Sequence, residues 1–169
     1  PAATDNCDAT LTPVKTSGAF VAGACSNAGT YTNTFVVTDD CGNTSLTYTQ
    51  VITITDAIAP TWTTAAGNLD RTLSCEDAAG LATAQALVPA ATDNCDATLT
   101  PVKTSGAFVA GSCSNAGTYT NTWTVTDDCS NTSLVYTQVI TITDNIAPTW
   151  TTAAGNLDRT ISCEDAAGL

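Results

Sequence analysis

Alternation of polar and apolar residues is clearest between residues 118 and 127. Tyr119, Asn121, Trp123 and Val125 fall on one side of an extended chain, and threonines occupy every position on the other side. Successive side chains of a strand point to opposite faces of a sheet. The pattern therefore predicts a strand with one buried face and one solvated face.

A second alternating run covers residues 134–144. Residues 127–131, with the sequence Asp-Asp-Cys-Ser-Asn, separate the two runs and have the composition of a turn. We expect the two runs to form a hairpin. The apolar face of the second run carries Leu134, Tyr136, Ile140 and Ile142, and the predicted core consists of Tyr119, Trp123, Tyr136, Ile140 and Ile142 together with the cysteines.

The rest of the chain contains shorter extended segments. They are predicted at residues 84–91, 97–109 and 157–162, interrupted by prolines and glycines. No segment has a clear helical pattern. About seven short strands separated by turns are typical of an immunoglobulin-like β-sandwich, so the expected fold class is all-β.

The chain is internally repeated. Residues 1–81 return as residues 89–169, a spacing of 88 residues. Near-identity at a fixed spacing is typical of an array of modules, and it favours a role in reach or valency over catalysis. Because 169 residues are slightly less than two periods, we expect the sequence to be a part of a longer polymer of the repeat. The aligned positions that differ are Ala24/Ser112, Phe35/Trp123, Val36/Thr124, Gly42/Ser130, Thr47/Val135, Ala57/Asn145 and Leu73/Ile161.

Charge and cysteine content limit the classes of protein. The net charge of −12 disfavours nucleic acids and anionic membrane surfaces as partners. No apolar run approaches the roughly 18 residues of a membrane span, so membrane insertion is not expected. Eight cysteines without a CxxC motif or any histidine disfavour zinc and thioredoxin-type chemistry. A small acidic module with several cysteines is typical of an extracellular, disulfide-bonded protein.

The candidate catalytic groups do not form an active site. The absence of histidine excludes Ser-His-Asp and Cys-His nucleophiles. The carboxylate pairs Asp39/Asp40 and Asp127/Asp128 lie in predicted turns, where adjacent side chains point apart and bind local amides. We therefore expect no enzymatic activity.

Several strings in the chain resemble a known family. VPAATDNC, GTYTNTWTVTDDCSNTS and YTQVITITDNIAPTW resemble the four-cysteine, HYR-like immunoglobulin repeat of giant Bacteroidota surface proteins. Such repeats occur in adhesins of the gliding-motility type, which the type IX secretion system exports. The resemblance implies three parts: residues 1–56 as the C-terminal part of one repeat, residues 57–144 as a complete repeat and residues 145–169 as the start of the next.

An immunoglobulin-like topology leads to a choice among the disulfides. Four cysteines in a unit allow three pairings. Cys113 and Cys129 lie at opposite ends of a strand of roughly 30 Å, too far apart for a bond. The expected pairs are Cys75–Cys113, Cys95–Cys129 and, in the first copy, Cys7–Cys41, while Cys25 and Cys163 pair with cysteines outside this sequence. Pairing between neighbours, Cys75–Cys95 and Cys113–Cys129, would contradict this topology.

Acidic residues gather near the linker between units. The segment from Asp56 to Pro60 enters the second unit at the end where two loops are also acidic, so the sequence predicts a calcium site with oxygen ligands from all three. The alternative is a set of Asx-turns with solvated charges. The candidate ligands are Asp56, Asp93, Asn94, Asp96, Asp127 and Asp128.

The function that agrees with these features is structural. We expect a stalk or filament on a bacterial surface, built from neighbouring repeats and serving adhesion or gliding, with Trp62 and Trp150 buried at unit junctions. One alternative is an array that binds a glycan or another surface ligand through many weak sites. Another is a filament of separate chains, in which residues 145–169 of one chain supply a missing strand to the next.

Overall fold

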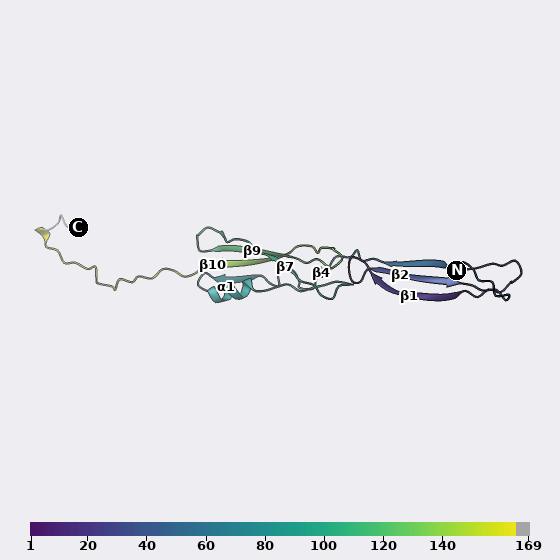
Figure 1. Ribbon diagram of the computed structural model, residues 1–169. Helices are drawn as coiled ribbons and strands as arrows, with labels where there is room; N and C mark the ends of the chain where they lie inside the picture. Colours follow the sequence, from purple (N-terminus) through teal and green to yellow (C-terminus); the bar gives the residue numbers. More distant parts are fainter. Residues whose placement is uncertain (165–169) are drawn as a thin grey trace.

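The computed structural model describes residues 1–164 and shows a long, thin molecule in which two β-rich units lie end to end (Figure 1). We name residues 1–56 the first unit, residues 57–144 the second unit and residues 145–164 the tail. The tail leaves the second unit and runs away from it along the long axis of the molecule. The last residues of the predicted third part, 165–169, lie outside the described residues.

The first unit is a three-stranded antiparallel sheet. Its strands, in sheet order, are β1 (Val14–Ala22), β2 (Gly29–Val36) and β3 (Tyr48–Ile54). The pairing of β1 with β2 shifts between Ser17 and Phe20. A Cβ atom on Gly18, inside this shift, would lie 2.2 Å from the Thr32 carbonyl oxygen, so the close approach of the two strands requires glycine there.

The second unit contains a larger sheet built on a similar hairpin. Its central strands β9 (Gly117–Thr124) and β10 (Tyr136–Thr143) pair antiparallel, which confirms the predicted hairpin. The flanking strands are β5 (Arg71–Ser74), β7 (Val102–Thr104) and β8 (Val109–Ala110), and a separate two-stranded ribbon joins β4 (Thr61–Trp62) to β6 (Ala91–Thr92). The fold class is the all-β sandwich that the sequence predicted.

A short helix, α1 (Ala78–Gln85), was missed by the sequence pattern. An extended segment was expected from residue 84, but the chain is helical up to residue 85. The Asp77 carboxylate caps the helix by accepting a hydrogen bond from the Gly80 N–H at 2.8 Å. Ala84 is buried and packs against Ile140 and Ile142 of β10. Within residues 1–164, no helix has the length and apolar character needed to cross a membrane.

The core of the second unit lies on the inner faces of β9 and β10. The predicted inward faces are confirmed, with Tyr119 half-buried against the same core. Leu134 is an exception: it is 87% exposed, because β10 begins only at Tyr136. The buried apolar side chains are Leu69, Ala84, Trp123, Val125, Tyr136, Ile140 and Ile142.

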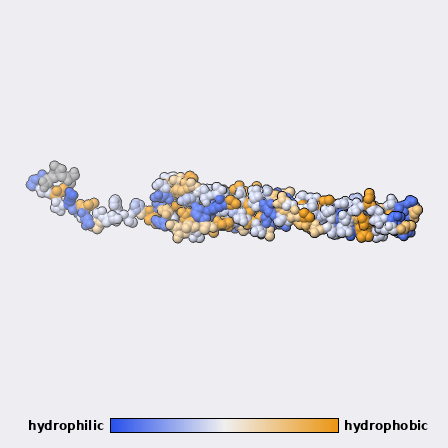
Figure 2. All heavy atoms as spheres, viewed as in Figure 1, coloured by the Kyte–Doolittle hydropathy of each residue, from blue (hydrophilic) through white to orange (hydrophobic). Residues whose placement is uncertain are grey.

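The corresponding face of the first unit is uncovered. Tyr48, Ile52 and Ile54 of β3 are 58%, 40% and 40% exposed, whereas their counterparts on β10 are 7% exposed or less. In the second unit β5, α1 and the segment between β4 and β5 cover this face. Figure 2 shows apolar residues at the surface of the first unit, toward the end opposite to the tail.

Candidate functional site

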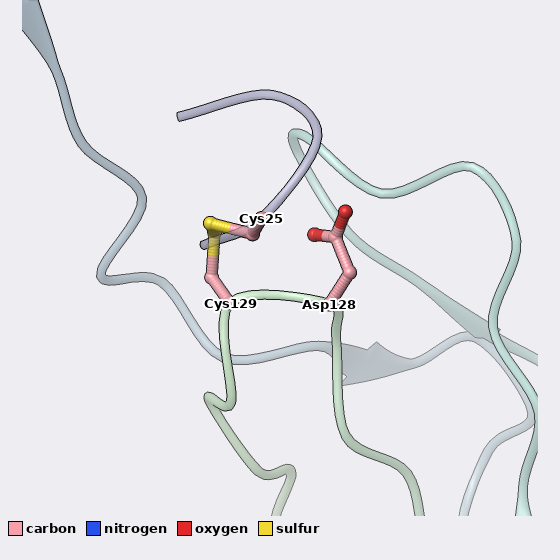
Figure 3. A group of neighbouring side chains, drawn as sticks. All are labelled: Cys25, Asp128 and Cys129. Carbon is pink, nitrogen blue, oxygen red and sulfur yellow. A yellow bond between two sulfur atoms is a disulfide. The ribbon is translucent and has the colours of Figure 1, made fainter. Parts of the chain in front are cut away.

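The two units meet where the turn between β1 and β2 touches the turn between β9 and β10. Cys25 of the first turn and Cys129 of the second form a disulfide with a Cα–Cα distance of 4.9 Å (Figure 3). The bond joins residues that are 104 positions apart in the sequence. It therefore links one unit covalently to the other.

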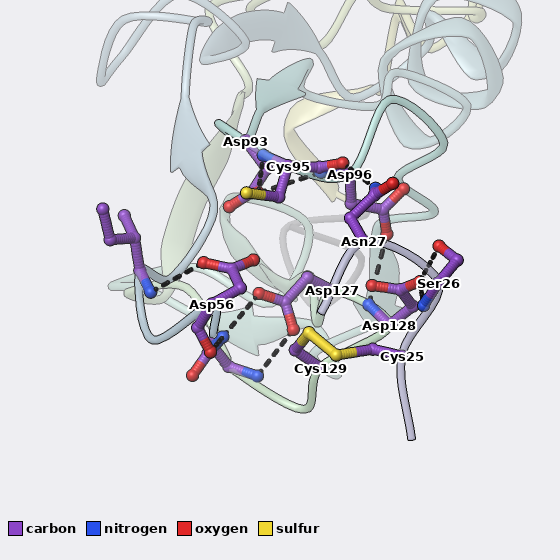
Figure 4. The surroundings of a disulfide bond; sticks show 12 residues. Cys25, Ser26, Asn27, Asp56, Asp93, Cys95, Asp96, Asp127, Asp128 and Cys129 are labelled. Atoms are coloured by element: carbon purple, nitrogen blue, oxygen red, sulfur yellow. Dashed lines mark hydrogen bonds between the residues drawn. A yellow bond between two sulfur atoms is a disulfide. The ribbon is translucent and has the colours of Figure 1, made fainter. Parts of the chain in front are cut away.

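Hydrogen bonds from the first unit add to the disulfide (Figure 4). The Ser26 N–H donates to Asp128 Oδ2 at 2.8 Å, and the Ser26 hydroxyl donates to the same oxygen. The Asn27 side-chain amide donates to the Cys95 carbonyl oxygen. The bonds from Ser26 stabilise the charged carboxylate and hold the pKa of Asp128 below its ordinary value.

A tight turn presents Cys129 to the first unit. The Asp127 carboxylate organises this turn by accepting hydrogen bonds from the Asn131 main-chain N–H at 2.7 Å and from the Asn131 side-chain amide at 2.8 Å. Ser130 has a φ of 75°, in the left-handed region that favours glycine. Its counterpart in the first unit is Gly42, with a φ of 88°. The turn is thus built from an Asx-type interaction and one left-handed residue.

The disulfide corrects the predicted pairing of two cysteines. We predicted Cys95–Cys129 and a partner for Cys25 outside the sequence, but Cys25 and Cys129 are bonded to each other. Cys95 is a free thiol, and Figure 4 shows its side chain beside Asp93, away from the disulfide. The pairing therefore crosses the junction instead of staying within the second unit.

The surroundings of Cys95 agree with a free thiol. Its sulfur accepts a hydrogen bond from the Asn94 side-chain amide at 2.8 Å. Partial burial, followed by the nearby carboxylates of Asp56 and Asp93, raises the pKa of Cys95 above its ordinary value. The thiol form is favoured there, since a thiolate would add a further negative charge to an acidic site.

The other two predicted disulfides are not formed. Cys7, Cys41, Cys75 and Cys113 are all free and exposed in the structure. At the junction a cysteine of the β1–β2 turn is instead bonded to the hairpin turn of the following unit, and the cysteines at the equivalent positions of the repeat, Cys113 and Cys41, are not bonded to Cys75 and Cys7. Cys163 is also free and exposed, and its pairing outside this sequence stays a prediction.

Three of the six predicted calcium ligands converge beside the junction. Carboxylate oxygens of Asp56, Asp93 and Asp127 all lie within 4.8 Å of one another. They come from the linker, from the segment after β6 and from the β9–β10 turn. Oδ2 of Asp56 and Oδ1 of Asp93 are buried and have no hydrogen-bond partner. Carboxylates from three segments, two of which have an unpaired buried oxygen, are a donor set that fits a hard cation such as Ca²⁺.

The other three predicted ligands make different contacts. Asp96 accepts hydrogen bonds from the Thr98 N–H at 2.7 Å and from the Asp128 N–H at 3.2 Å. Asn94 directs its amide nitrogen, not its oxygen, toward Asp56 Oδ1 at 3.4 Å. Asp128 lies beside the disulfide, whose sulfur atoms are not thiolate ligands. The structure thus reduces the candidate site to three carboxylates.

The tryptophans expected at unit junctions have different positions. Trp62 is half-buried inside the second unit, where its ring lies 5.5 Å from that of Tyr136 and its indole N–H donates to the Leu134 carbonyl oxygen at 2.7 Å. Its counterpart Trp150, on the tail, is 95% exposed. The prediction of burial at a junction is therefore wrong for Trp62. An exposed aromatic platform in each unit, which an array of glycan sites would require, is not formed by Trp62.

The far end of the second unit carries an open hollow of about 410 Å³. Cys75, Asp77, Phe108, Ser114 and Tyr119 contribute to its lining. Burial and the charges of Asp144 and Glu76 raise the pKa of Cys75.

Residues 63–142 match the family model described as the HYR-like domain with 4 cysteines. The match spans most of the second unit and includes Cys75, Cys95, Cys113 and Cys129. It supports the HYR-like character of the repeat. No curated protein and no solved structure matches the chain.

Proposed function

We propose that the chain is a structural segment of an extracellular stalk or filament on a bacterial surface, where it serves adhesion or gliding. HYR-like domains occur in extracellular and surface proteins and are typically adhesion-type modules without enzymatic activity. The end-to-end arrangement of the units gives the chain reach for its mass. The observation that carries the proposal is the covalent bond between the units.

The disulfide limits how far the molecule extends under load. A force applied to the two ends passes directly from Cys25 to Cys129, so the residues between them are not pulled apart. At about 3.5 Å per extended residue, the enclosed chain represents a contour length of about 360 Å. A stalk with this bond stretches less when its sheets open, which suits a mechanical tether.

Single-molecule pulling from the two ends tests this role. The oxidised chain is expected to release about 360 Å less contour length than the Cys129→Ser chain. Cys41→Ser is the matched control, because Cys41 holds the same position in the first unit and is free. It should behave as the unchanged protein. Equal extension of the oxidised and Cys129→Ser chains would reject the extension limit and with it the main support for the structural role.

The alternative of a multivalent glycan-binding array leads to a different result. In that case each complete unit would bind a glycan. Probing a panel of immobilised glycans with the oxidised chain measures this binding directly. The packing of Trp62 against Tyr136 disfavours it, because the aromatic residue is then used within the unit. We therefore place the structural role first.

We also propose that Asp56, Asp93 and Asp127 bind Ca²⁺ and stiffen the junction. Asp56 lies in the linker, so a cation shared with Asp93 and Asp127 would hold the linker against the second unit. Bringing three carboxylates together without a cation is unfavourable because like charges repel. A bound cation would remove that repulsion and satisfy the unpaired oxygens of Asp56 and Asp93.

Isothermal titration with CaCl₂ tests this site. Asp93→Asn is expected to weaken Ca²⁺ binding by at least about tenfold, because it replaces one charged ligand of three. Asp5→Asn is the control: Asp5 is the counterpart of Asp93 in the first unit, and among the described residues it is not part of the carboxylate cluster. Absence of binding at millimolar Ca²⁺, or equal loss in both variants, would reject the site.

A further inference from the structure

The junction disulfide and the carboxylate next to it bring a second set of ligand atoms together. The sulfur atoms of Cys25 and Cys129 and a carboxylate oxygen of Asp128 all lie within 4.8 Å of one another (Figure 3). Both cysteines are half-buried and Asp128 is exposed, so small solutes can reach them. Bonded to each other, the sulfurs are not metal ligands, because the ligand form of cysteine is the thiolate. Reduction would place two thiols beside one carboxylate.

Hydrogen bonds between the units hold these three residues together independently of the disulfide (Figure 4). The Ser26 N–H donates to Asp128 Oδ2 at 2.8 Å, and the Asn27 side-chain amide donates to the Cys95 carbonyl oxygen. Ser26 directly follows Cys25, and Asp128 directly precedes Cys129. The contacts that remain after reduction therefore keep the two sulfurs beside each other. Both bonds from Ser26 go to Oδ2, which leaves Oδ1 of Asp128 for a metal ion.

Each of the two turns is also fixed within its own unit. In the β1–β2 turn the Gly23 N–H donates to the Ala28 carbonyl oxygen at 2.7 Å. In the β9–β10 turn the Asn131 N–H donates to the Asp127 carboxylate at 2.7 Å. None of these hydrogen bonds depends on the bond between the sulfurs. The positions of the ligands are thus set by two ordered turns, as a metal site requires.

We propose that the reduced junction binds Zn²⁺ through the thiolates of Cys25 and Cys129 and the carboxylate of Asp128. Two thiolates favour zinc over a hard cation, and a water molecule completes a tetrahedron around the ion. Zn–S bonds of about 2.3 Å place two sulfurs about 3.8 Å apart in a tetrahedral site. Cysteines whose Cα atoms are 4.9 Å apart can reach this separation. The site shares no residue with the carboxylate cluster that fits Ca²⁺.

The sequence argument against zinc does not apply to this site. That argument rests on the lack of a CxxC motif and of histidine, and it concerns ligands that lie close together in the sequence. Cys25 and Cys129 are 104 positions apart and belong to different units. The ligands converge only because the β1–β2 turn meets the β9–β10 turn, which no sequence spacing records.

Two chemical steps lead to the zinc-bound junction. A water-soluble phosphine first supplies two electrons to the disulfide and becomes the phosphine oxide. Its oxygen comes from water, and the two protons of that water end on the two cysteine sulfurs as thiols. Zn²⁺ then replaces both thiol protons, which pass to solvent, and the Asp128 carboxylate binds without a proton change.

Zinc binding gives the junction a second kind of link between the units. The ion joins Cys25 of the first unit to Asp128 and Cys129 of the second, so the units stay attached when the disulfide is reduced. Because the ligands can leave the metal without a redox reaction, this link is reversible. The inference goes beyond the proposed structural role, which concerns the oxidised chain.

The test uses a full-length chain in which only the two junction cysteines remain. Without the other thiols, neither a rearranged disulfide nor another cysteine can account for metal binding. We call it the two-cysteine chain, and circular dichroism confirms that it is folded after reduction. It carries the substitutions Cys7→Ser, Cys41→Ser, Cys75→Ser, Cys95→Ser, Cys113→Ser and Cys163→Ser, all at cysteines that are free in the structure.

Co²⁺ is the first probe, because thiolate-bound Co²⁺ absorbs light and Zn²⁺ binds the same ligands more tightly. The reduced two-cysteine chain is expected to bind one equivalent of Co²⁺ with sulfur-to-cobalt charge-transfer absorption, and one equivalent of Zn²⁺ should abolish that absorption. The oxidised chain should give no such absorption. A reduced chain that lacks the absorption, whether folded or unfolded, overturns the proposal.

Two substitutions in the two-cysteine chain identify the ligands. Asp128→Asn keeps an oxygen that accepts from Ser26 but removes the charged ligand, and it should weaken Zn²⁺ binding at least about tenfold. Asp40→Asn is the matched control, because exposed Asp40 is the counterpart of Asp128 in the first unit; its affinity should be unchanged. Equal affinities of the two variants overturn the site. Cys129→Ser should weaken binding at least about 100-fold, and undiminished binding would mean an adventitious ion only and overturn the proposal.

Single-molecule pulling of the reduced two-cysteine chain measures the link itself. With Zn²⁺ the enclosed chain should be released, by about 360 Å, only after a separate rupture of the metal bridge. With a chelator in place of Zn²⁺ that rupture should be missing, and identical traces overturn the proposal. A reduced chain without a zinc effect leaves the structural role intact, since the extension limit is measured on the oxidised chain. Loss of that limit in the oxidised chain would reject the structural role and leave the zinc site.

Discussion

A single left-handed residue shapes each hairpin turn. Ser130 and Gly42 occupy the same position of the repeat, with φ values of 75° and 88°. A side chain in this region costs roughly 1 kcal/mol, and glycine avoids most of that cost. A Cβ on Gly42 would meet no atom within 4 Å, so only the backbone conformation disfavours a side chain there.

The two positions should respond to substitution in opposite directions. We expect Ser130→Gly to raise the free energy of unfolding by about 0.5–1 kcal/mol and Gly42→Ser to lower it by a similar amount. Urea unfolding followed by circular dichroism measures both variants. A Ser130→Gly chain that unfolds at lower urea than the unchanged protein would contradict the assignment of strain to this residue.

Asp128 makes the junction sensitive to acid. Its hydrogen bonds from Ser26 lower its pKa below the ordinary value of 3.8. A carboxylate with a lowered folded pKa stabilises the contact fully above its unfolded pKa, and this contribution is lost as the pH falls through the folded pKa. We therefore expect the contact to be intact at neutral pH and to weaken only below about pH 3.8.

The chemical shift of the Ser26 amide, followed by NMR from pH 6 down to pH 2, measures this titration. It should change with a midpoint below 3.8, and the change should vanish in Asp128→Asn, which has no proton to gain. A midpoint above 3.8 in the unchanged chain would show that the hydrogen bonds do not stabilise the charged carboxylate.

At the scale of elements, a buried amide joins the hairpin to the segments that cover it. Gln138 of β10 is 0% exposed, and its side-chain N–H groups donate to the carbonyl oxygens of Leu69 at 2.7 Å and Ala84 at 3.1 Å. Its side-chain oxygen accepts from Asn121 of β9 at 2.9 Å. One side chain therefore connects both central strands to α1 and to the chain before β5.

Loss of this amide should destabilise the second unit. Gln138→Leu leaves the Leu69 carbonyl oxygen buried without a donor and removes one of the two donors to the Ala84 carbonyl oxygen, the other being the Leu87 N–H, and we expect a loss of about 2–4 kcal/mol. Gln50→Leu is the comparison at the same position of the first unit: Gln50 is exposed on β3 and its side-chain oxygen accepts one hydrogen bond, from the Asn33 amide at 3.1 Å, so we expect a smaller loss of about 0.5–1.5 kcal/mol. Tryptophan fluorescence during urea unfolding reports on Gln138→Leu, and circular dichroism reports on Gln50→Leu. Similar losses in the two variants would contradict this account.

The elements that the sequence predicted are those whose patterns depend on burial alone. β9 and β10 alternate strictly because one face packs on a core, and that alternation is visible without knowledge of the partner segments. α1 has small residues on all sides and includes Gly80 and Thr83, so it has no apolar stripe to reveal it. Its position depends on the Asp77 cap and on the space left above Ile140, which are tertiary features.

At the scale of the whole molecule, the correct disulfide could not be predicted because the sequence is internally repeated. A cysteine in one unit and its counterpart in the next have the same sequence context, so a pairing rule derived within one unit cannot distinguish a bond inside the unit from a bond to its neighbour. The strand-length argument against Cys113–Cys129 agrees with the structure, in which Cys113 is free. The acidic linker was visible in the sequence, but which carboxylates converge depended on how the linker meets the two loops.

The bond between the units should also set the stability of the whole chain. A disulfide that closes a loop of about 100 residues restricts the unfolded chain, and this effect raises the free energy of unfolding by up to about 4.7 kcal/mol. The measured contribution of a disulfide is typically about 2–4 kcal/mol. We expect Cys129→Ser to lower the free energy of unfolding by about 2–4 kcal/mol, whereas Cys41→Ser, at the same position of the first unit, should change it little. Urea unfolding of the oxidised chains measures both. Because the loop contains Trp123 and most of the second unit, the loss should appear in tryptophan fluorescence. A loss confined to the first unit would mean that the disulfide only attaches the first unit to an independently stable neighbour.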